Sequence, residues 1–429
     1  MSADWATYTL GELGLIKTGK TPPSAIGNAF GGEIAFVTPS DMNGQKWITN
    51  TVRYLNKHGL DAVRSSLMPA RSVAVSCIGS DMGKAALLSR PSVTNQQINT
   101  IAVDESKFNA EFVYYDLSVR QQELKNAASG SATPILNKGH FSAFEISVPP
   151  KDIQDKIAKI LGGFDDKIAL NRQINQTLEA MAQAIFKSWF VDFDPVKAKI
   201  AAIEAGQDPL RAAMSTISGK NNAELDAMPR QQYDELAATA TLFPEELVDV
   251  PKGWKTQKIG DFIERISVGK KFNQKSALPE GSVPILDQGK SGIIGFHNEK
   301  PSVFASLNKP VVVFANHTCY MRLITFDFSA IQNVLPFIGG TVDTIWAYYA
   351  TKDKIKFSEY KGHWPDFVLI ETVVPTLDLT IHFRKVIEPL VFQMRSLEQQ
   401  SEQLAVLRDT LLPKLLSGEL SVAELEEVV

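Results

Sequence analysis

Two stretches of the chain place apolar residues at alternating steps of three and four, which is the pattern of a helix with one apolar seam. They cover residues 151–194, interpreted as a central helical spacer, and residues 376–429, a C-terminal helical spacer. We expect the seams to pack against each other or against a partner through Ile168, Leu178, Met181, Ile185, Trp189 and Phe190 in the first stretch and Leu397, Leu404, Leu407, Leu411 and Leu415 in the second.

Helix-breaking residues interrupt both stretches at the same relative position. Gly162-Gly163 stands in the first and Glu388-Pro389 in the second. Glycine and proline both weaken a helix interior. Each stretch is therefore predicted to form a short helix, a break and then a long helix of about 25 residues, which would span roughly 40 Å.

Short β-like runs separated by Gly, Pro, Asn and Ser dominate two other regions, residues 1–150 (lobe 1) and residues 251–375 (lobe 2). Examples are residues 73–78 and 311–314. Helical candidates within the lobes are fewer, so each lobe is predicted to be α/β or α+β with a mixed sheet. Residues 195–250, between the first spacer and lobe 2, form a polar, alanine-rich connector with short helical patterns.

The chain also repeats itself. Residues 5–13 and 254–262 share Trp, Gly, an acid and an apolar residue at an offset of 249, and Lys-Gly-His-aromatic recurs at 138–141 and 361–364. The two helical seams match at an offset of 226. Three anchors in the same order indicate two copies of one unit, each a lobe followed by a helix. We expect the two long helices to pair as an antiparallel coiled coil with approximate two-fold symmetry.

The composition is that of an ordinary folded protein: 429 residues, 44% apolar and 21% charged. No apolar run reaches the ~20 residues needed to span a bilayer. The first residues lack the basic and apolar segments of a secretion signal, so we expect a cytoplasmic protein without a membrane partner. Cys77 and Cys319 stand far apart inside apolar runs and are expected to be reduced and buried.

The formal charge of −4 argues mildly against a nucleic-acid partner until it is divided by region. Lobe 1 has 13 Lys and Arg against 12 Asp and Glu, net +1, and lobe 2 has 15 against 11, net +4. Residues 151–250 carry −5 and residues 376–429 carry −4. The acidity therefore belongs to the helices and connector, and the lobes remain candidates for binding DNA.

Two divergent lobes on a helical ruler suit B-DNA, on which paired recognition segments lie about one turn, ~34 Å, apart. We therefore predict a split, asymmetric double-stranded DNA target. Asn and Gln suit adenine edges, Lys and Arg suit guanine and phosphate, and Ser and Thr suit either. The candidates at turns are Lys17, Lys20, Thr38, Ser40, Asp41, Ser80, Asp81, Lys84, Ser129, Ser131 and Lys138 in lobe 1 and Lys270, Lys271, Asp287, Gln288, Lys290, Asn316, His317, Arg322, Lys361 and His363 in lobe 2.

Each of these residues also has an ordinary interpretation as a solvated loop residue. For His140 and His363, a structural turn is as good an explanation as a DNA contact. The polar groups 95–97 and 332–333 are better explained as side chains that brace backbone turns. A third view of the whole chain, an interaction scaffold that uses only its coiled coil, would leave the divergent lobes without a purpose.

One motif suggests an enzyme instead. Gly14–Thr21 fits the phosphate-loop pattern G-x-x-x-x-G-K-[ST], which would make the chain a P-loop NTPase or another DNA-processing enzyme. That chemistry requires a helix directly after the loop, whereas Pro22-Pro23 follows here. The sequence also lacks a zinc-spaced Cys/His cluster, a Gly-x-Ser-x-Gly elbow and an amino-methyltransferase motif. We expect a chain without catalytic residues or a metal site.

The whole chain resembles the specificity subunit of type I restriction–modification systems. The resemblance rests on seven segments, which are Leu10–Leu13, Thr94–Asn99, Val148–Pro150, Ile153–Ile157, Ile185–Pro195, Pro251–Trp254 and Leu411–Leu420. It implies that lobes 1 and 2 are target-recognition domains and that the chain joins two modification subunits that methylate adenine at N6. It also implies that restriction–translocase subunits can join. The chain itself would bind no cofactor, because S-adenosylmethionine, and ATP with Mg²⁺ for restriction, would belong to those partners.

Overall fold

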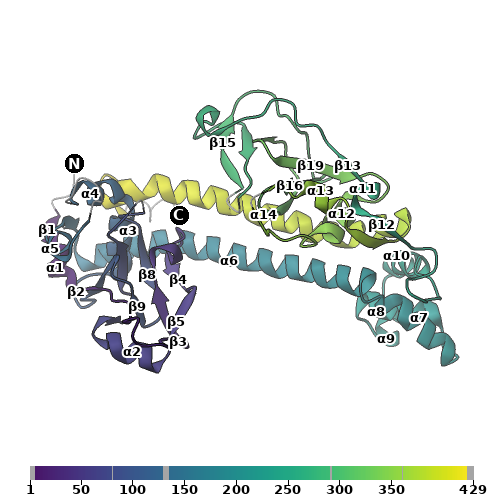
Figure 1. Cartoon of the computed structure of the whole chain (residues 1–429), viewed down its shortest axis with the longest axis horizontal. Helices are drawn as coiled ribbons and strands as arrows, with labels where there is room; N and C mark the ends of the chain where they lie inside the picture. The colour runs from purple at the N-terminus through teal and green to yellow at the C-terminus, as the bar shows by residue number, and fades with distance from the viewer. Residues whose placement is uncertain (1–4, 80, 129–134, 290–291, 360, 423–429) are drawn as a thin grey trace. The chain divides into compact units, whose positions relative to one another are not determined.

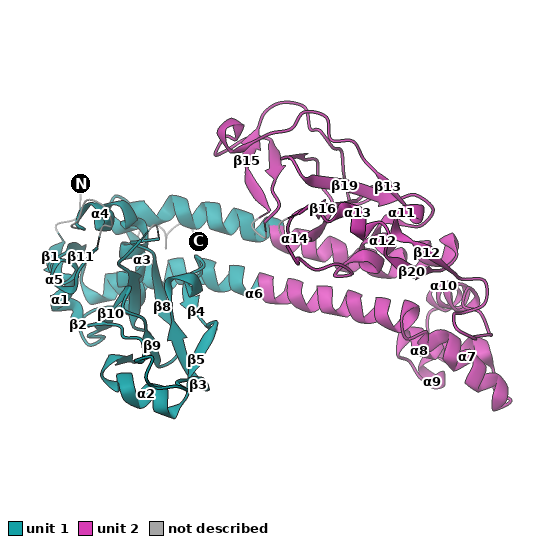
Figure 2. Ribbon diagram, viewed as in Figure 1, with its two compact units in different colours: residues 1–171, 399–429 teal, residues 172–398 magenta. Residues whose placement is uncertain are grey.

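The structure is a computed structural model that describes residues 5–79, 81–128, 135–289, 292–359 and 361–422 (Figure 1). The chain divides into two compact units (Figure 2). Unit 1 contains residues 1–171 and 399–429, and unit 2 contains residues 172–398. Each unit therefore combines one lobe with a part of both long helical stretches.

Lobe 1 is built on two mixed sheets. The larger has the strand order β2 (Gly14–Thr18), β10 (Ile98–Val103), β7 (Val73–Ser76), β8 (Ala85–Leu88), β4 (Trp47–Ile48). The other has the order β5 (Arg53–Leu55), β3 (Phe30–Val37), β9 (Ser92–Thr94), β6 (Leu67–Met68). Parallel pairing occurs between β3 and β9 and between β4 and β8. The helices are α1 (Leu10–Leu13), α2 (Lys57–Val63), α3 (Ala110–Val119), α4 (Gln121–Asn126) and α5 (Lys138–Ser142).

Lobe 2 has the same two-sheet plan, but its second sheet is smaller. Its main sheet has the order β13 (Ile263–Arg265), β19 (Val334–Gly339), β16 (Val311–Ala315), β17 (Met321–Ile324). Its second sheet has the order β15 (Ile293–His297), β14 (Val283–Leu286), β18 (Ser329–Ala330), with β14 and β18 parallel. The helices are α11 (Ile259–Phe262), α12 (Thr344–Thr351) and α13 (Trp364–Phe367).

The internal repeat is visible in strand pairing. The order β2-β10-β7-β8 in lobe 1 corresponds to β13-β19-β16-β17 in lobe 2. An antiparallel pair closes each lobe: β1 (Ala6–Thr9) with β11 (Glu145–Val148), and β12 (Lys255–Lys258) with β20 (Glu371–Val374). Ala6 pairs with Val148, and Lys255 pairs with Val374. Lys255 follows Ala6 by the offset of 249 and Val374 follows Val148 by the offset of 226, so the two pairs have the same register. The predicted fold class is confirmed.

The two long helices are uninterrupted, so the predicted break is wrong in both. Helix α6 (Lys151–Phe190) and helix α14 (Leu377–Leu416) each contain 40 residues. Packing outweighs local propensity at both sites. A Cβ at Gly162 would lie 3.1 Å from Lys46 Nζ, so lobe 1 covers the helix closely there. Pro389 lies between Ile387 and Val391, which are both buried in the core of unit 2 and hold the helix across the proline.

Helices α6 and α14 run antiparallel within each unit, as predicted. In unit 1, Asp165 contacts Arg408 and Asn171 contacts Gln400. In unit 2, Asn175 Nδ2 donates to the carbonyl of Met394, and Phe186 packs on Phe383 with ring centroids 5.7 Å apart. Within each unit, the residue numbers of the contacting pairs therefore increase along α6 as they decrease along α14.

Each lobe packs against the last turns of one long helix. Leu412, Leu415 and Leu416 of α14 belong to the core of lobe 1, and Trp189 and Phe190 of α6 belong to the core of lobe 2. Ile168 and Leu178 are buried as well, while Met181 and Leu407 are about half exposed. The remaining seam residues are partly buried: Ile185, Leu397, Leu404 and Leu411.

The connector folds into four helices with a core of their own, composed of Ala213, Met214, Leu225 and Ala240. The helices are α7 (Asp194–Glu204), α8 (Pro209–Ser218), α9 (Asn222–Asp226) and α10 (Arg230–Thr241). Among the described helices, none combines the length and the apolar character that crossing a bilayer would need.

Candidate nucleic-acid interface

Three turns of lobe 2 come together through hydrogen bonds. Gln288, after β14, accepts from the backbone N–H of His317 at 3.0 Å through its Oε1, and its carbonyl accepts from Thr318 Oγ1 at 2.6 Å. His317 Nδ1 lies 2.9 Å from the carbonyl of Lys361, so this ring nitrogen carries the proton and donates. The turns after β14 and β16 and the segment before α13 thus form one polar edge.

Two candidates at this edge brace it. Asn316 Oδ1 accepts from the backbone N–H of Trp364 at 2.9 Å, and the Asn316 carbonyl accepts from the N–H of His363 at 2.9 Å. The His363 side chain is buried and its Nε2 lies 3.2 Å from the carbonyl of Glu359. The structural interpretation is therefore favoured for His363. His140, its counterpart in lobe 1, is exposed.

A basic segment adjoins this edge. Lys352, Lys356 and Phe357 line a cleft together with Gln288 and Thr318. Lys356 and Phe357 are exposed, as is the neighbouring Lys354. Lysine attracts phosphate, so this basic composition suits the DNA backbone. Lys354, Lys356 and Phe357 were missed in the sequence analysis, although lysine at every second position from 352 to 356 was a visible signal.

Lys361 is partly neutralised by its neighbours. Its Nζ lies 3.1 Å from a carboxylate oxygen of Glu359 and 3.1 Å from one of Asp366. Hydrogen bonding to Asp366, and then to Glu359, raises the pKa of Lys361. Lys361 stays charged in this position, but its field is shared with two acids.

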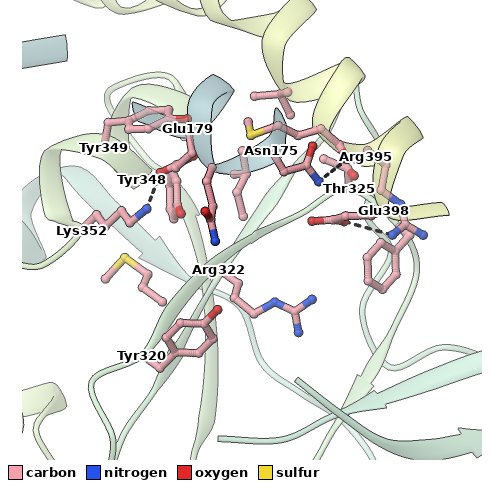
Figure 3. Close-up of a pocket in the computed structure, with 16 residues that line it drawn as sticks. Asn175, Glu179, Tyr320, Arg322, Thr325, Tyr348, Tyr349, Lys352, Arg395 and Glu398 are labelled. Carbon is pink, nitrogen blue, oxygen red and sulfur yellow. Dashed lines mark hydrogen bonds and ion pairs between the residues drawn. The ribbon is translucent and has the colours of Figure 1, made fainter. Parts of the chain in front are cut away.

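Arg322 approaches the same edge from β17. It lies against the turn between β14 and β15, since a Cβ at Gly292 would fall 1.9 Å from Arg322 Nη1. This nitrogen is buried and has no hydrogen-bond partner among the described residues. Figure 3 shows Arg322 and Tyr320 on the side of a pocket opposite Glu179 and Asn175.

The other lobe 2 candidates are placed separately. Lys270 forms an ion pair with Glu299 at 2.5 Å and lies over the ring of Phe272. Lys271 is exposed, and Asp287 Oδ1 accepts from the N–H of Gly289 at 3.0 Å. Lys290 lies outside the described residues. The polar edge of lobe 2 therefore gathers Gln288, Asn316, His317, Arg322 and Lys361, and Lys270 with its partner is a separate group.

In lobe 1, one group of candidates forms a closed turn. Asp41 Oδ2 accepts from the N–H of Thr38 at 2.8 Å and from its hydroxyl at 2.7 Å, and Asp41 Oδ1 accepts from the N–H of Val52 at 2.9 Å. Ser40 Oγ lies 2.8 Å from Thr38 Oγ1. Asp41 is bonded on both oxygens, to Thr38 within the turn and to Val52 outside it, so Asp41 shapes the turn while Ser40 remains exposed.

The remaining lobe 1 candidates are dispersed. Lys17 Nζ lies 3.4 Å from the carbonyl of Leu67, and Asp81 pairs with Lys84 at 2.8 Å. Lys20 and Lys138 are exposed. Ser80, Ser129 and Ser131 lie outside the described residues.

The polar groups at 95–97 and 332–333 hold backbone in place. Asn95 Oδ1 accepts from the N–H of Gln97 at 3.1 Å, and Gln96 Oε1 accepts from the hydroxyl of Thr21 at 2.6 Å. Asn333 has a left-handed backbone, with φ 69°, and its carbonyl accepts from the N–H of Asn316 at 2.9 Å. Both groups therefore brace turns, and the second supports the polar edge of lobe 2.

The phosphate-loop alternative is contradicted by the structure. Gly14 begins strand β2, where a Cβ would lie 2.1 Å from the carbonyl of Ala102, and a Cβ at Gly19 would lie 2.2 Å from that of Asn95. Both glycines are explained by close backbone packing. All of residues 19–29 are described, and they contain no helix that could hold a phosphate.

A serine–histidine pair in lobe 2 resembles a hydrolytic site but has the wrong proton arrangement. His297 Nδ1 accepts from the N–H of Glu299 at 3.0 Å, so Nε2 carries the proton and donates to Ser329 Oγ at 2.9 Å. A donor cannot act as the base that activates serine. Burial lowers the pKa of His297, which keeps the ring neutral, and Ser329 is fully buried.

Comparison with known proteins identifies the family. Residues 2–180 match the type I restriction modification DNA specificity domain. The HindI specificity subunit of Haemophilus influenzae is 31% identical over 336 residues, which cover 68% of this chain and 73% of that protein. The chain belongs to the type I restriction enzyme specificity subunits. The MjaIX specificity subunit of Methanocaldococcus jannaschii is 25% identical over 98% of this chain and 95% of its own length.

The fold agrees with that family. The crystal structure of a type I restriction–modification S subunit from M. genitalium superposes with a TM-score of 0.52 over 96% of both chains, at 16% identity. A specificity subunit is the non-catalytic component that recognises DNA and assembles with other subunits. Among the described residues, no group of three His, Cys, Asp or Glu side chains could hold a metal ion.

Proposed function

We propose that this specificity subunit reads an asymmetric, split DNA sequence, with one half-site for each lobe. The observation that carries the proposal is the repeated strand order of the two lobes combined with different turns on the repeated frame. The shared strand order gives each lobe the same way of packing on its helices, and the different turns give the two lobes different DNA-contacting surfaces. Residues 1–150 and 251–375 are the two target-recognition domains of this proposal.

The contacts divide into base-reading and phosphate-binding groups. In lobe 2, Gln288, His317 and Arg322 are proposed to face base edges, since amide, imidazole and guanidinium groups hydrogen-bond there. Lys354 and Lys356 are proposed to bind phosphates, which position the protein without carrying sequence information. In lobe 1 the exposed candidates Lys20, Ser40 and Lys138 are proposed to have the corresponding roles, together with the half-buried Lys84.

The helices α6 and α14 are proposed to serve as the spacer and as the assembly surface. Two modification subunits that methylate adenine at N6 would bind here and carry S-adenosylmethionine, and restriction–translocase subunits with ATP and Mg²⁺ could join them. Met181 and Leu407 are about half exposed on these helices and are the seam residues offered to a partner. A DNA target of this kind places the complex in the cytoplasm.

The modest net charge of the lobes has a consequence for affinity. Phosphate contacts dominate protein–DNA binding, and the two lobes together carry only a small positive charge. The subunit alone should therefore bind DNA weakly, and the assembled complex should bind it tightly.

Methylome sequencing of cells that express this chain with its modification subunit tests the proposal. We expect N6-methyladenine on both strands of one motif with two short defined halves and an undefined gap. A single uninterrupted motif, or methylation by this chain without the partner, would contradict it. ATP hydrolysis by the purified chain alone would contradict the non-catalytic role.

A further inference from the structure

A buried tyrosine links lobe 1 to both long helices. The hydroxyl of Tyr115, in α3, donates to Asp165 Oδ2 of α6 at 2.5 Å. Arg408 Nη1 of α14 lies 2.5 Å from the other oxygen of the same carboxylate. Tyr115 is 2% exposed, and the side chain of Asp165 is 12% exposed. One carboxylate thus joins three elements of unit 1 at a largely buried point, where the Arg408 side chain is 27% exposed.

Lobe 2 has a similar link, in which the tyrosine is at the equivalent position but the carboxylate stands elsewhere in the repeat. The hydroxyl of Tyr349, in α12, donates to Glu179 Oε2 of α6 at 3.1 Å, and Lys352 forms an ion pair with the same carboxylate (Figure 3). Tyr115 and Tyr349 are both the second residue of a Tyr-Tyr pair in the helix that follows the central strands. We call the groups Tyr115–Asp165–Arg408 and Tyr349–Glu179–Lys352 clasp 1 and clasp 2.

The two clasps are not identical, because their cations come from different elements. Arg408 of clasp 1 belongs to α14, so clasp 1 ties the lobe to both helices. Lys352 of clasp 2 follows α12 and belongs to lobe 2 itself, so clasp 2 ties the lobe to α6 only. The phenol–carboxylate distance is also shorter in clasp 1.

A clasp differs physically from the apolar packing around it. Contacts among leucine, phenylalanine and tryptophan side chains are non-directional and tolerate small shifts between surfaces. A hydrogen bond from a phenol to an ionised carboxylate is charge-assisted and holds both distance and angle. Burial and the neighbouring carboxylate raise the pKa of Tyr115, so the phenol keeps its proton and remains a donor.

We propose that the two clasps are positioning sites that fix the seat of each lobe on the helix pair, and that they thereby restrict the complex to one gap length between the half-sites. The proposal rests on the proposed function, because a gap exists only if the two lobes read two half-sites. Tyr115, Asp165, Tyr349 and Glu179 are positioning residues in this scheme and touch no DNA.

The test uses the complete chain with its modification subunit and reads the methylated gap lengths by methylome sequencing. Tyr115→Phe removes only the hydroxyl of clasp 1. Tyr114→Phe is the matched control, because Tyr114 is the adjacent buried tyrosine and its hydroxyl makes no hydrogen bond among the described residues. Asp165→Glu keeps the carboxylate, as Glu179 does in clasp 2, and serves as the conservative variant.

For Tyr115→Phe we expect unchanged half-sites and about 10-fold more methylation at gaps one base pair longer or shorter, the factor typical of losing one charge-assisted hydrogen bond. Tyr349→Phe should give a smaller increase, Tyr114→Phe none, and Asp165→Glu less than Tyr115→Phe. A lower melting temperature alone would not broaden the gap, so gap length separates positioning from simple stability.

An unchanged single gap for Tyr115→Phe would overturn the clasp proposal while leaving the split target intact. Loss of all methylation by Tyr115→Phe and Asp165→Glu together would also overturn it, because these residues would then serve folding and not spacing. If the wild-type complex methylates no split motif, the proposed function itself fails, and that result is distinct from both.

Discussion

The two lobes share their central sheet but differ at its periphery. In both, the strand that leads to the Tyr-Tyr helix, β10 or β19, pairs with the first strand of the central sheet, β2 or β13. The second sheet has four strands in lobe 1 and three in lobe 2. The central strands must carry the helix that packs on α6 and α14, so their order is constrained. The turns carry no such constraint, and most of the candidate DNA contacts lie in turns, whereas Lys17 of β2 and Arg322 of β17 lie on central strands.

The same helix position in the two lobes shows how divergence produces different surfaces. Asp116 is fully buried in lobe 1 and pairs with Arg120 at 2.7 Å, and the equivalent positions in lobe 2 hold Ala350 and Lys354. The cation of lobe 1 is therefore neutralised inside the fold. The cation of lobe 2 is exposed and forms no ion pair among the described residues.

Exchange of residues 15–140 for the corresponding region of a relative is expected to have the largest effect. One half of the methylated motif should change completely and the other should stay the same, because the proposal assigns one half-site to each lobe. Methylome sequencing of the hybrid measures this. A change in both halves would show that the lobes do not act as separate readers.

Removing the helix-end anchors should distinguish the two units by stability. Trp189→Ala should cost about 4 kcal/mol and Leu415→Ala about 3 kcal/mol, because both side chains are buried and leave cavities. Hydrogen exchange should show lost protection of β16 and β19 for Trp189→Ala, and of β7 and β10 for Leu415→Ala. Leu407→Ala, at a half-exposed position, is the control. Equal loss in both units from either variant would refute separate anchoring.

Asp116 should give lobe 1 a pH dependence that lobe 2 lacks. Burial raises the pKa of Asp116 to about 6. Between pH 4 and pH 6 the folded state therefore keeps a proton that the unfolded state has released, so stability falls as pH rises. The loss is at most about 3 kcal/mol, complete above pH 6. Asp116→Asn should abolish this part of the dependence in urea unfolding of lobe 1, and an unchanged slope would contradict the burial effect.

Removing the exposed lysines of lobe 2 should have the smallest effect. For Lys354→Ala with Lys356→Ala, the slope of log affinity against log salt should fall by about 2, one unit for each lost phosphate contact, with the half-site sequence unchanged. Titration of DNA with the assembled complex at several salt concentrations measures this. Lys309→Ala, an exposed lysine outside the cleft, is the control. A changed half-site would instead place these lysines at base edges.

The repeat, the fold class and the antiparallel helices could be predicted because they depend on patterns spread over many residues. The predicted helix breaks failed because tertiary packing supports the helix at both sites. Lys46 of lobe 1 lies against Gly162, and the residues next to Pro389 are buried in the core of unit 2. The gathering of Gln288, His317 and Lys361 could not be predicted either. Hydrogen bonds between three turns depend on strand order, and single residues do not reveal it.

The discontinuity of unit 1 determines the order in which the two units can be completed during synthesis. Unit 2 is one continuous segment, residues 172–398, whereas unit 1 needs residues 399–429 to finish its core. Leu412, Leu415 and Leu416 reach lobe 1 only after all 227 residues of unit 2 have been translated. At typical translation rates of 5–20 residues per second, that delay is roughly 10 to 45 s. Lobe 1 is thus synthesised first and completed last. During the interval, the surface of lobe 1 that will pack on these leucines of α14 is uncovered and must avoid wrong contacts with the growing chain.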